Sequence, residues 1–209
     1  MATFTVVYDA CVFYPAPLRD LLIRLARTRR FRARWTARIH EEWTRNLLAD
    51  RPDLTSERLE RTVILINKAV EDCLVTGYEP IIEGLKLPDP DDRHVLAAAI
   101  RVGAAAIVTM NLKDFPKEAL GEFGVFAIHP DDFILDLADL EPPILERVAK
   151  EQRASLLNPP LSAEEFISSI RRQGLPGVAD FLEDRLDLIW AHHGPNSPAT
   201  FDRHLTGPK

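Results

Sequence analysis

The sequence predicts an α/β fold, with a mostly parallel β-sheet flanked by helices and an α-helical C-terminal extension. Short apolar runs typical of buried strands alternate with amphipathic stretches as far as about residue 136. Such alternation indicates a parallel sheet that is covered on both faces. After about residue 138 only helical periodicity remains, which predicts the extension.

The predicted elements follow one another in a regular order. Strands are predicted at 4–8, 31–35, 105–109 and 124–128. Helices are predicted at 18–26, 39–48, 57–75 and 91–102, with Gly103 ending the last of them, and a short helix follows Pro116. Three further helices are predicted at 144–157, 162–173 and 176–190. We therefore expect one α/β domain at 1–137, a helical extension at 138–191 and a flexible tail at 192–209.

The composition is that of an ordinary globular protein, with 46% hydrophobic and 28% charged residues in 209. No apolar run approaches the roughly 18 residues that a membrane-spanning helix needs. The first residues lead directly into a strand pattern and lack the features of a secretory signal. Cys11 and Cys73 show neither a disulfide pattern nor metal-type spacing. We expect a reduced cytoplasmic protein without membrane contact.

The formal net charge of −6 argues against a protein that coats nucleic acid. A local segment reverses this balance, because eight arginines and a single acid lie between Arg19 and Arg38. Such a segment is a candidate for binding phosphates. The alternative is a solvated basic helix face followed by a turn.

Four carboxylates that are far apart in the sequence lie at the edges of apolar segments: Asp9, Glu42, Asp92 and Asp114. Asp9 ends the first predicted strand, and Asp114 follows the third after a short turn. Because the carboxyl ends of parallel strands meet at one crevice, we expect these acids to form one site. Each acid alone also has a structural explanation, such as capping a helix. Together they predict a cluster that holds Mg²⁺ or Mn²⁺.

Four segments carry a resemblance to a known family. They are Val6-Val-Tyr-Asp9-Ala-Cys-Val-Phe, His40-Glu-Glu42-Trp-Thr-Arg-Asn-Leu47, Pro88-Asp-Pro-Asp-Asp92-Arg-His-Val-Leu-Ala-Ala-Ala99 and Val108-Thr-Met-Asn-Leu-Lys-Asp114-Phe-Pro. In this order and spacing, they resemble the PIN-domain family of metal-dependent ribonucleases, which includes the VapC-like toxins of toxin–antitoxin modules. The resemblance covers residues 3–136, and the region after 138 resembles a helical extension found on some VapC-like proteins.

The resemblance implies a site and a reaction. Asp9, Asp92 and Asp114 would be the metal ligands, with Glu42 holding or deprotonating a metal-bound water. Thr109, Asn111 and Asp91 would orient these groups. Asn111 stands where many members of the family carry a carboxylate, so the fourth acidic role falls to Asp114. Hydrolysis would leave a 5′-phosphate and a 3′-hydroxyl. RNA would be the substrate, with contacts from Arg29, Arg30, Arg32 and Arg34, and the implied partners are a cognate antitoxin and a second copy in a homodimer.

Other functions find less support in the sequence. A haloacid-dehalogenase-type phosphatase needs an acid two residues after Asp9, where this chain has Cys11. A zinc-protease helix beginning at His40 lacks its second histidine, and no phosphate-binding or dinucleotide-binding glycine motif occurs. No histidine is positioned by sequence to activate Cys11, so packing is its simpler role. The competing hypothesis is a non-catalytic PIN-like module that binds RNA or protein.

Overall fold

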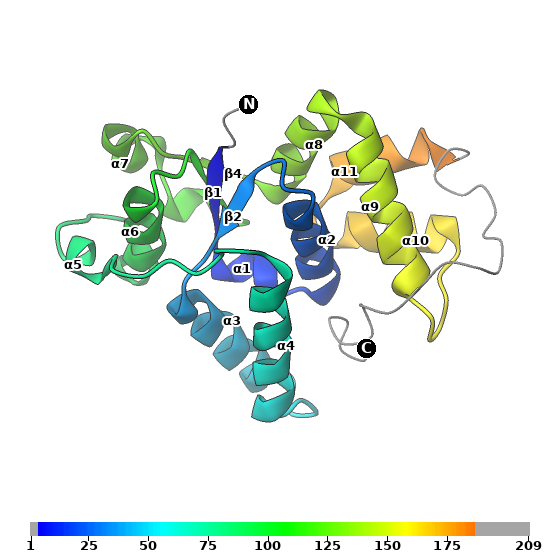
Figure 1. Cartoon of the computed structure of the whole chain (residues 1–209), viewed down its shortest axis with the longest axis horizontal. Helices are drawn as coiled ribbons and strands as arrows, with labels where there is room; N and C mark the ends of the chain where they lie inside the picture. Colours follow the sequence, from blue (N-terminus) through cyan, green and yellow to red (C-terminus); the bar gives the residue numbers. More distant parts are fainter. Residues whose placement is uncertain (1–3, 187–209) are drawn as a thin grey trace. The chain divides into compact units, whose positions relative to one another are not determined.

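The computed structural model describes residues 4–186, shown in Figure 1. Within this range the chain forms two compact units. The first comprises residues 4–14 and 29–130, and the second comprises residues 15–28 and 131–186. The second unit therefore includes a segment from near the start of the chain, which separates Asp9 from the second strand in sequence.

The first unit is built on a parallel sheet with the strand order β2-β1-β3-β4. The strands are β1 (Thr5–Tyr8), β2 (Arg32–Arg34), β3 (Ala106–Val108) and β4 (Phe126–Ile128). In register, Val6 pairs with Ala33 on one side and with Ala106 on the other. All pairs are parallel, so the carboxyl ends of β1 and β3 lie side by side. The predicted fold class is confirmed.

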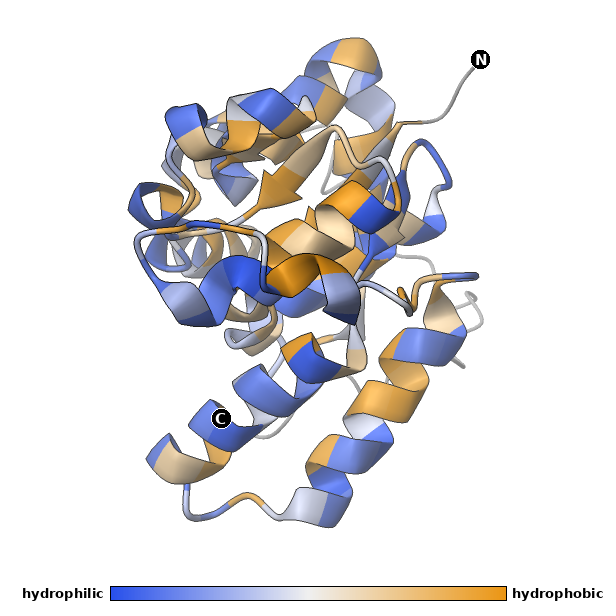
Figure 2. Cartoon of the chain, turned by 90° about the vertical axis from the view of Figure 1, so that its left-hand side faces the viewer, coloured by the Kyte–Doolittle hydropathy of each residue, from blue (hydrophilic) through white to orange (hydrophobic). Residues whose placement is uncertain are grey.

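The two central strands form the core of this unit. Val6, Val7 and Tyr8 of β1 are completely buried, as are Ile107 and Val108 of β3. This explains why both strands read as continuous apolar runs. Figure 2 shows an orange, hydrophobic strand arrow within the sheet. Helix α6 (Arg93–Arg101) packs against both strands with its buried residues 94–99.

The remaining helices of the first unit are short, apart from α3 and α4. They are α1 (Ala10–Phe13), α3 (Ala37–Asp50), α4 (Ser56–Ala69), α5 (Glu79–Ile82), the 3₁₀ turn η1 (Pro90–Asp92), η2 (Leu112–Asp114), α7 (Lys117–Leu120) and η3 (Gly121–Phe123). Thr36 and Thr55 cap the amino ends of α3 and α4 by accepting hydrogen bonds from Ile39 N and Arg58 N.

An aromatic cluster fixes α3 to the end of β1. Phe13 of α1 packs edge-on against Trp35, and its ring also contacts Trp43 of α3. His40 connects the cluster by hydrogen bonds, because its Nδ1 accepts from Trp43 Nε1 and its Nε2 lies 2.9 Å from Asn67 Oδ1 of α4. These buried contacts position the neighbouring Glu42 on α3.

The predicted helix 57–75 was too long at its carboxyl end. The structure ends α4 at Ala69, because Val70 is extended and Asp72 has a φ of 52°. Leu74 then forms a parallel bridge with Trp35, next to β2. The apolar residues of this stretch therefore belong to a sheet-edge contact, and the helical spacing of the sequence did not distinguish the two.

The second unit is helical. Its elements are α2 (Ala16–Arg27), α8 (Pro130–Leu140), α9 (Pro142–Ser155), α10 (Ala163–Arg172) and α11 (Pro176–Glu183). The first residue of α8, Pro130, is counted with the first unit. Helix α2 packs against α9 and α10. Helix α8 was not predicted, although Phe133, Ile134, Leu137 and Ala138 are buried and have helical spacing.

The predicted domain limits can be compared with these units. The limit between 137 and 138 falls inside α8, and residues 15–28 belong to the second unit. The predicted helix 176–190 is described only as far as residue 186. The predicted tail at 192–209 lies outside the described residues. No helix within residues 4–186 is long and apolar enough to cross a membrane.

Candidate active site

Asp9 lies where β1 meets α1 and is only 4% exposed. Its Oδ1 accepts a hydrogen bond from Ala10 N at 2.6 Å, as expected of a residue that caps a helix. Its Oδ2 accepts hydrogen bonds from Thr109 Oγ1 at 2.7 Å and from Cys11 Sγ at 3.0 Å. Burial raises the pKa of Asp9, and the negative charge of Glu42 adds to the effect. The carboxylate is therefore fixed in orientation at the carboxyl end of the sheet.

Asp92 occupies the junction of η1 and α6 and is half-buried. Its pKa is raised to about 7, first by burial and then by the charges of Asp9, Asp89, Asp114 and Glu42. The fold thus brings all four predicted acids into electrostatic contact. It also adds Asp89, whose carboxylate accepts a hydrogen bond from Asp91 N at 2.8 Å.

The turn after β3 supplies the remaining predicted residues. The Thr109 hydroxyl is completely buried, donates to Asp9 and accepts a hydrogen bond from Asn111 N at 3.0 Å. Asp114 N in turn donates to Asn111 O at 3.1 Å within the turn that contains η2. Asn111 is exposed and Asp114 is half-buried. Thr109 therefore joins the β1 and β3 ends of the site.

His94 is a site residue that sequence reasoning missed. It lies on α6 two residues after Asp92 and is 1% exposed, and its Nε2 lies 3.2 Å from Oε2 of Glu42. Because a carboxylate only accepts hydrogen bonds, Nε2 must be the donor. Nδ1 is buried and has no hydrogen-bond partner in the described part of the chain. Proximity to Asp92 in sequence was the only signal.

Cys11 also belongs to the site. Its thiol donates to Asp9 Oδ2 and accepts a hydrogen bond from Met110 N at 3.2 Å. Burial raises the pKa of this thiol strongly, and the neighbouring Asp9 charge raises it further. Since the thiolate is the nucleophilic form of cysteine, this environment does not suit nucleophilic catalysis.

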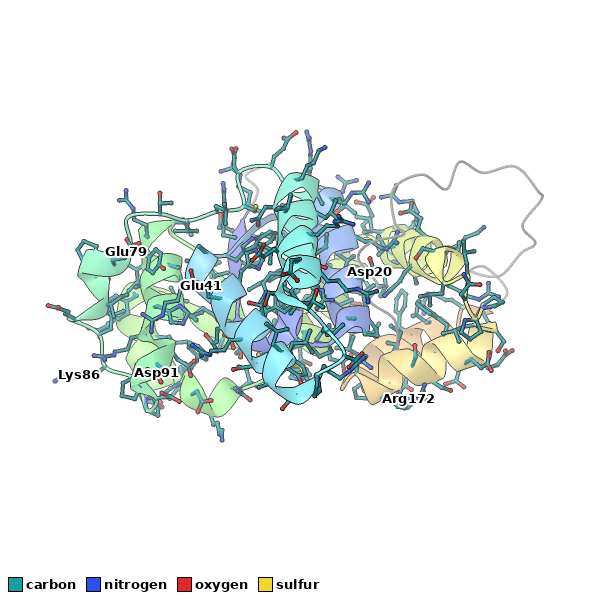
Figure 3. All side chains as sticks on the ribbon, turned by 90° about the horizontal axis from the view of Figure 1, so that it is seen from below. Asp20, Glu41, Glu79, Lys86, Asp91 and Arg172 are labelled. Carbon is teal, nitrogen blue, oxygen red and sulfur yellow. The ribbon has the colours of Figure 1, made fainter. Side chains whose placement is uncertain are left out.

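The other predicted side chains lie elsewhere or are less buried. Asp91 is exposed in the turn before α6, as Figure 3 shows. Arg29 and Arg30 precede β2, and Arg32 pairs in register with Thr5 at the start of β1. These three arginines therefore lie toward the amino ends of the strands, whereas the acids lie at the carboxyl ends. Arg34 pairs with Val7, nearer the acids.

The proposal that the whole segment from Arg19 to Arg38 holds phosphates needs correction. Arg19 and Arg24 are each 4% exposed and belong to α2 of the second unit. Arg24 pairs with Asp20 at 3.1 Å and donates to Ser155 Oγ at 3.0 Å. A buried guanidinium that is paired in this way cannot contact RNA.

A cavity of about 550 Å³ lies beside the acids in the first unit. Cys11, Glu42 and Asn111 belong both to its wall and to the site described above. Within residues 4–186, no three His, Cys, Asp or Glu side chains converge as a ready-made metal-binding set.

The four-stranded parallel sheet and its flanking helices place the chain among α/β proteins. Residues 5–113, more than half of the chain, match the family model described as PIN domain, and the chain belongs to this family. Residues 130–184 match a second model, described as VapC50 C-terminal domain.

A relative from Mycobacterium tuberculosis (strain ATCC 25618 / H37Rv), named "Putative ribonuclease VapC50", is 42% identical over 97 residues. The matched segment is 46% of this chain and 57% of the relative, so the chain spans less than two thirds of that protein's length. No solved structure matches the chain.

Proposed function

We propose that this protein is a Mg²⁺- or Mn²⁺-dependent endoribonuclease of the cytoplasm, and the toxin of a type II toxin–antitoxin module. One observation carries the proposal: Asp92 has its pKa raised to about 7, in part by four other acids around it. A fold holds such a cluster at a cost in stability, and a bound cation offsets that cost. Membership of the PIN-domain family and the name of the relative support the nuclease class.

The donor set suits a hard divalent ion. Asp9, Asp92 and Asp114 offer only oxygen ligands, which Mg²⁺ and Mn²⁺ prefer. When bound, such an ion supplies an electrophile for the phosphoryl oxygens and makes a water more acidic. Thr109 and Cys11 hold Oδ2 of Asp9 in one orientation through their hydrogen bonds.

We assign Glu42 the role of general base. His94 engages Oε2 of Glu42 and leaves Oε1 to accept a proton from the attacking water. The Glu42 side chain is 29% exposed, so water reaches it, whereas His94 is buried behind it. Restricting the carboxylate in this way keeps it oriented for a single proton transfer.

Asp9→Asn tests the proposal directly. RNA cleavage is measured by mapping new 5′ ends in total RNA with Mg²⁺, with Mn²⁺ and with EDTA. The wild-type chain should produce discrete metal-dependent ends. Asp9→Asn should lose about a hundredfold of the rate or more, because loss of a group that only supports a metal ligand already costs about 10- to 100-fold. Glu41→Gln is the matched control, because Glu41 is an exposed acid on α3 beside Glu42 (Figure 3). Equal cleavage by wild type and Asp9→Asn would refute the mechanism.

A non-catalytic PIN-like module that binds RNA or protein is the second candidate. The absence of a ready-made metal-binding set within residues 4–186 favours it. Titration with Mn²⁺ separates the two, because a binding module should show neither thermal stabilisation by Mn²⁺ nor RNA cleavage.

The toxin role adds an antitoxin and a homodimer as partners. We propose that the helices after 138 contribute to one of these contacts. Deleting residues 140–209 is a poor test, because it removes α9 and α10, against which the buried leucines of α2 pack. Leu140 and Leu157 are 78% and 51% exposed, and their substitution by Ser leaves the packing of α2 intact. Unchanged dimerisation and unchanged antitoxin binding by both variants would count against this role.

A further inference from the structure

The cavity beside the acids has walls that suit a nucleobase. Its volume is about 550 Å³, and every residue that lines it belongs to the first unit. Helix α3 runs along it: Glu42, Asn46 and Asp50 follow at four-residue spacing and so lie on one face of the helix. The cavity therefore begins at the acids and extends away from them.

The walls combine flat apolar surface with polar edges. The partly exposed Tyr14 ring and Met110 contribute apolar surface, while Asn46 and Asn111 contribute amides that can both donate and accept hydrogen bonds. Among residues 4–186, the only charged side chains in the wall are the acids Glu42 and Asp50, and no lysine or arginine of this range lines the cavity. A phosphate would be repelled there. A neutral planar group with donors on its edge is the chemistry that fits.

Asp50 gives this cavity a preference among bases. Tyr14 Oη donates a hydrogen bond of 2.5 Å to Asp50 Oδ2, which holds the carboxylate at the wall and leaves Oδ1 to accept another hydrogen bond. A carboxylate accepts only, so it favours an exocyclic amino group, as in its pairing with N4 of cytosine. Uracil presents carbonyl oxygens at the corresponding edge positions and would meet like charge.

We propose that this cavity binds an unpaired, amino-bearing base of the RNA next to the scissile phosphate, with Asp50 selecting against uracil. The inference rests on the proposed nuclease function, because the acids locate the phosphate. Sequence-specific recognition of RNA targets unpaired bases whose edges are accessible, which matches a cavity open beside the site.

Cytidine and uridine provide a matched pair of probes, since they differ at position 4 by an amino group against a carbonyl oxygen. We would titrate each nucleoside into the ¹⁵N-labelled full chain and follow the side-chain amide signals of Asn46 and Asn111. Cytidine should shift both signals and bind about fivefold to tenfold more tightly than uridine, at the lower end of base discrimination by hydrogen bonds. Asp50→Asn should bring the ratio close to one, because an amide can also donate to a carbonyl.

Glu41→Gln is the control, because it removes the same charge from α3 at an exposed position outside this cavity. It should leave the cytidine preference unchanged. The proposal is overturned if neither nucleoside shifts the two asparagine signals, if both bind equally to the wild-type chain, or if the preference survives in Asp50→Asn. Nucleosides contain no phosphodiester bond, so this result does not depend on cleavage. A failure of Asp9→Asn to change RNA cleavage would refute the nuclease function separately.

Discussion

Replacing Asp92 by Asn should stabilise the metal-free protein at neutral and alkaline pH. The pKa of Asp92 is raised from 3.8 to about 7. In the unfolded chain the carboxyl loses its proton near pH 4, whereas in the folded chain it keeps the proton until about pH 7. The raised pKa of Asp92 costs the folded state nothing below about pH 4, where the carboxyl is protonated in both states. The free energy of unfolding then falls as the pH rises from about 4 through about 7, because the folded state holds a proton that the unfolded state has lost. Asn carries no titratable proton and so avoids this loss.

The size of the effect follows from the shift. Each unit of pKa corresponds to about 1.4 kcal/mol, so the full shift would represent about 4 kcal/mol. Asp92 is only half-buried, and solvent screens its neighbours, so we expect about half of this value. The advantage of Asp92→Asn over the wild type should therefore grow by about 2 kcal/mol between about pH 4.5 and about pH 8.

Urea unfolding in EDTA measures this difference. Tryptophan fluorescence is a suitable probe, because Trp35 and Trp43 are fully buried in the first unit. Asp91→Asn is the matched control, since it removes the same charge from the same turn at an exposed position. Mn²⁺ at a hundredfold excess over the dissociation constant should stabilise the wild type by about 2 to 3 kcal/mol, which is enough to cancel the advantage of Asp92→Asn.

Two outcomes would refute this reasoning. If the free-energy difference between Asp92→Asn and the wild type does not change with pH, the acids do not interact as the fold implies. If Asp91→Asn shows the same pH dependence, the effect comes from general charge reduction and not from the cluster.

Three further predictions test other parts of the molecule. His94→Leu should lower RNA cleavage at least tenfold, and His94→Gln should restore part of the lost rate. Neither variant should lower cleavage further in a Glu42→Gln background. If the effects of His94→Leu and Glu42→Gln on the rate were fully additive, His94 would not act through Glu42. Gly177→Ala should destabilise the chain by about 1 to 3 kcal/mol in thermal unfolding, because the added Cβ would lie 2.7 Å from a leucine methyl of α8; an unchanged melting temperature would contradict this packing. Asp20→Ala should cost about 3 to 5 kcal/mol by leaving the buried guanidinium of Arg24 without its carboxylate, whereas a loss below about 1 kcal/mol would indicate that water replaces it.

Local patterns were sufficient for most of the fold. The strands at Thr5–Tyr8 and Ala106–Val108 lie within the predicted runs, because a strand buried on both faces must be continuously apolar. Gly103 follows the end of α6 as expected, and its φ of 58° is a conformation that favours glycine. The end of α4 was misjudged because apolar spacing alone does not separate a helix from a following sheet-edge contact.

Long-range pairing could not be predicted in the same way. The hydrogen bond between His94 and Glu42 joins residues 52 positions apart, and nothing in the local sequence of either one requires it. The burial of Arg19 and Arg24 has the same origin, because α2 packs with the helices that follow residue 130. In sequence these arginines were indistinguishable from their exposed neighbours.

The sequence by itself determined the α/β class and the position of Asp9 at the end of the first strand, because these depend on periodicities of two and 3.6 residues. Only the tertiary structure decided which side chains orient the acids, which arginines remain exposed and what chemistry the adjoining cavity can accept. Each of these depends on contacts between segments distant along the chain, and the burial and hydrogen bonds that result are properties of the packed molecule.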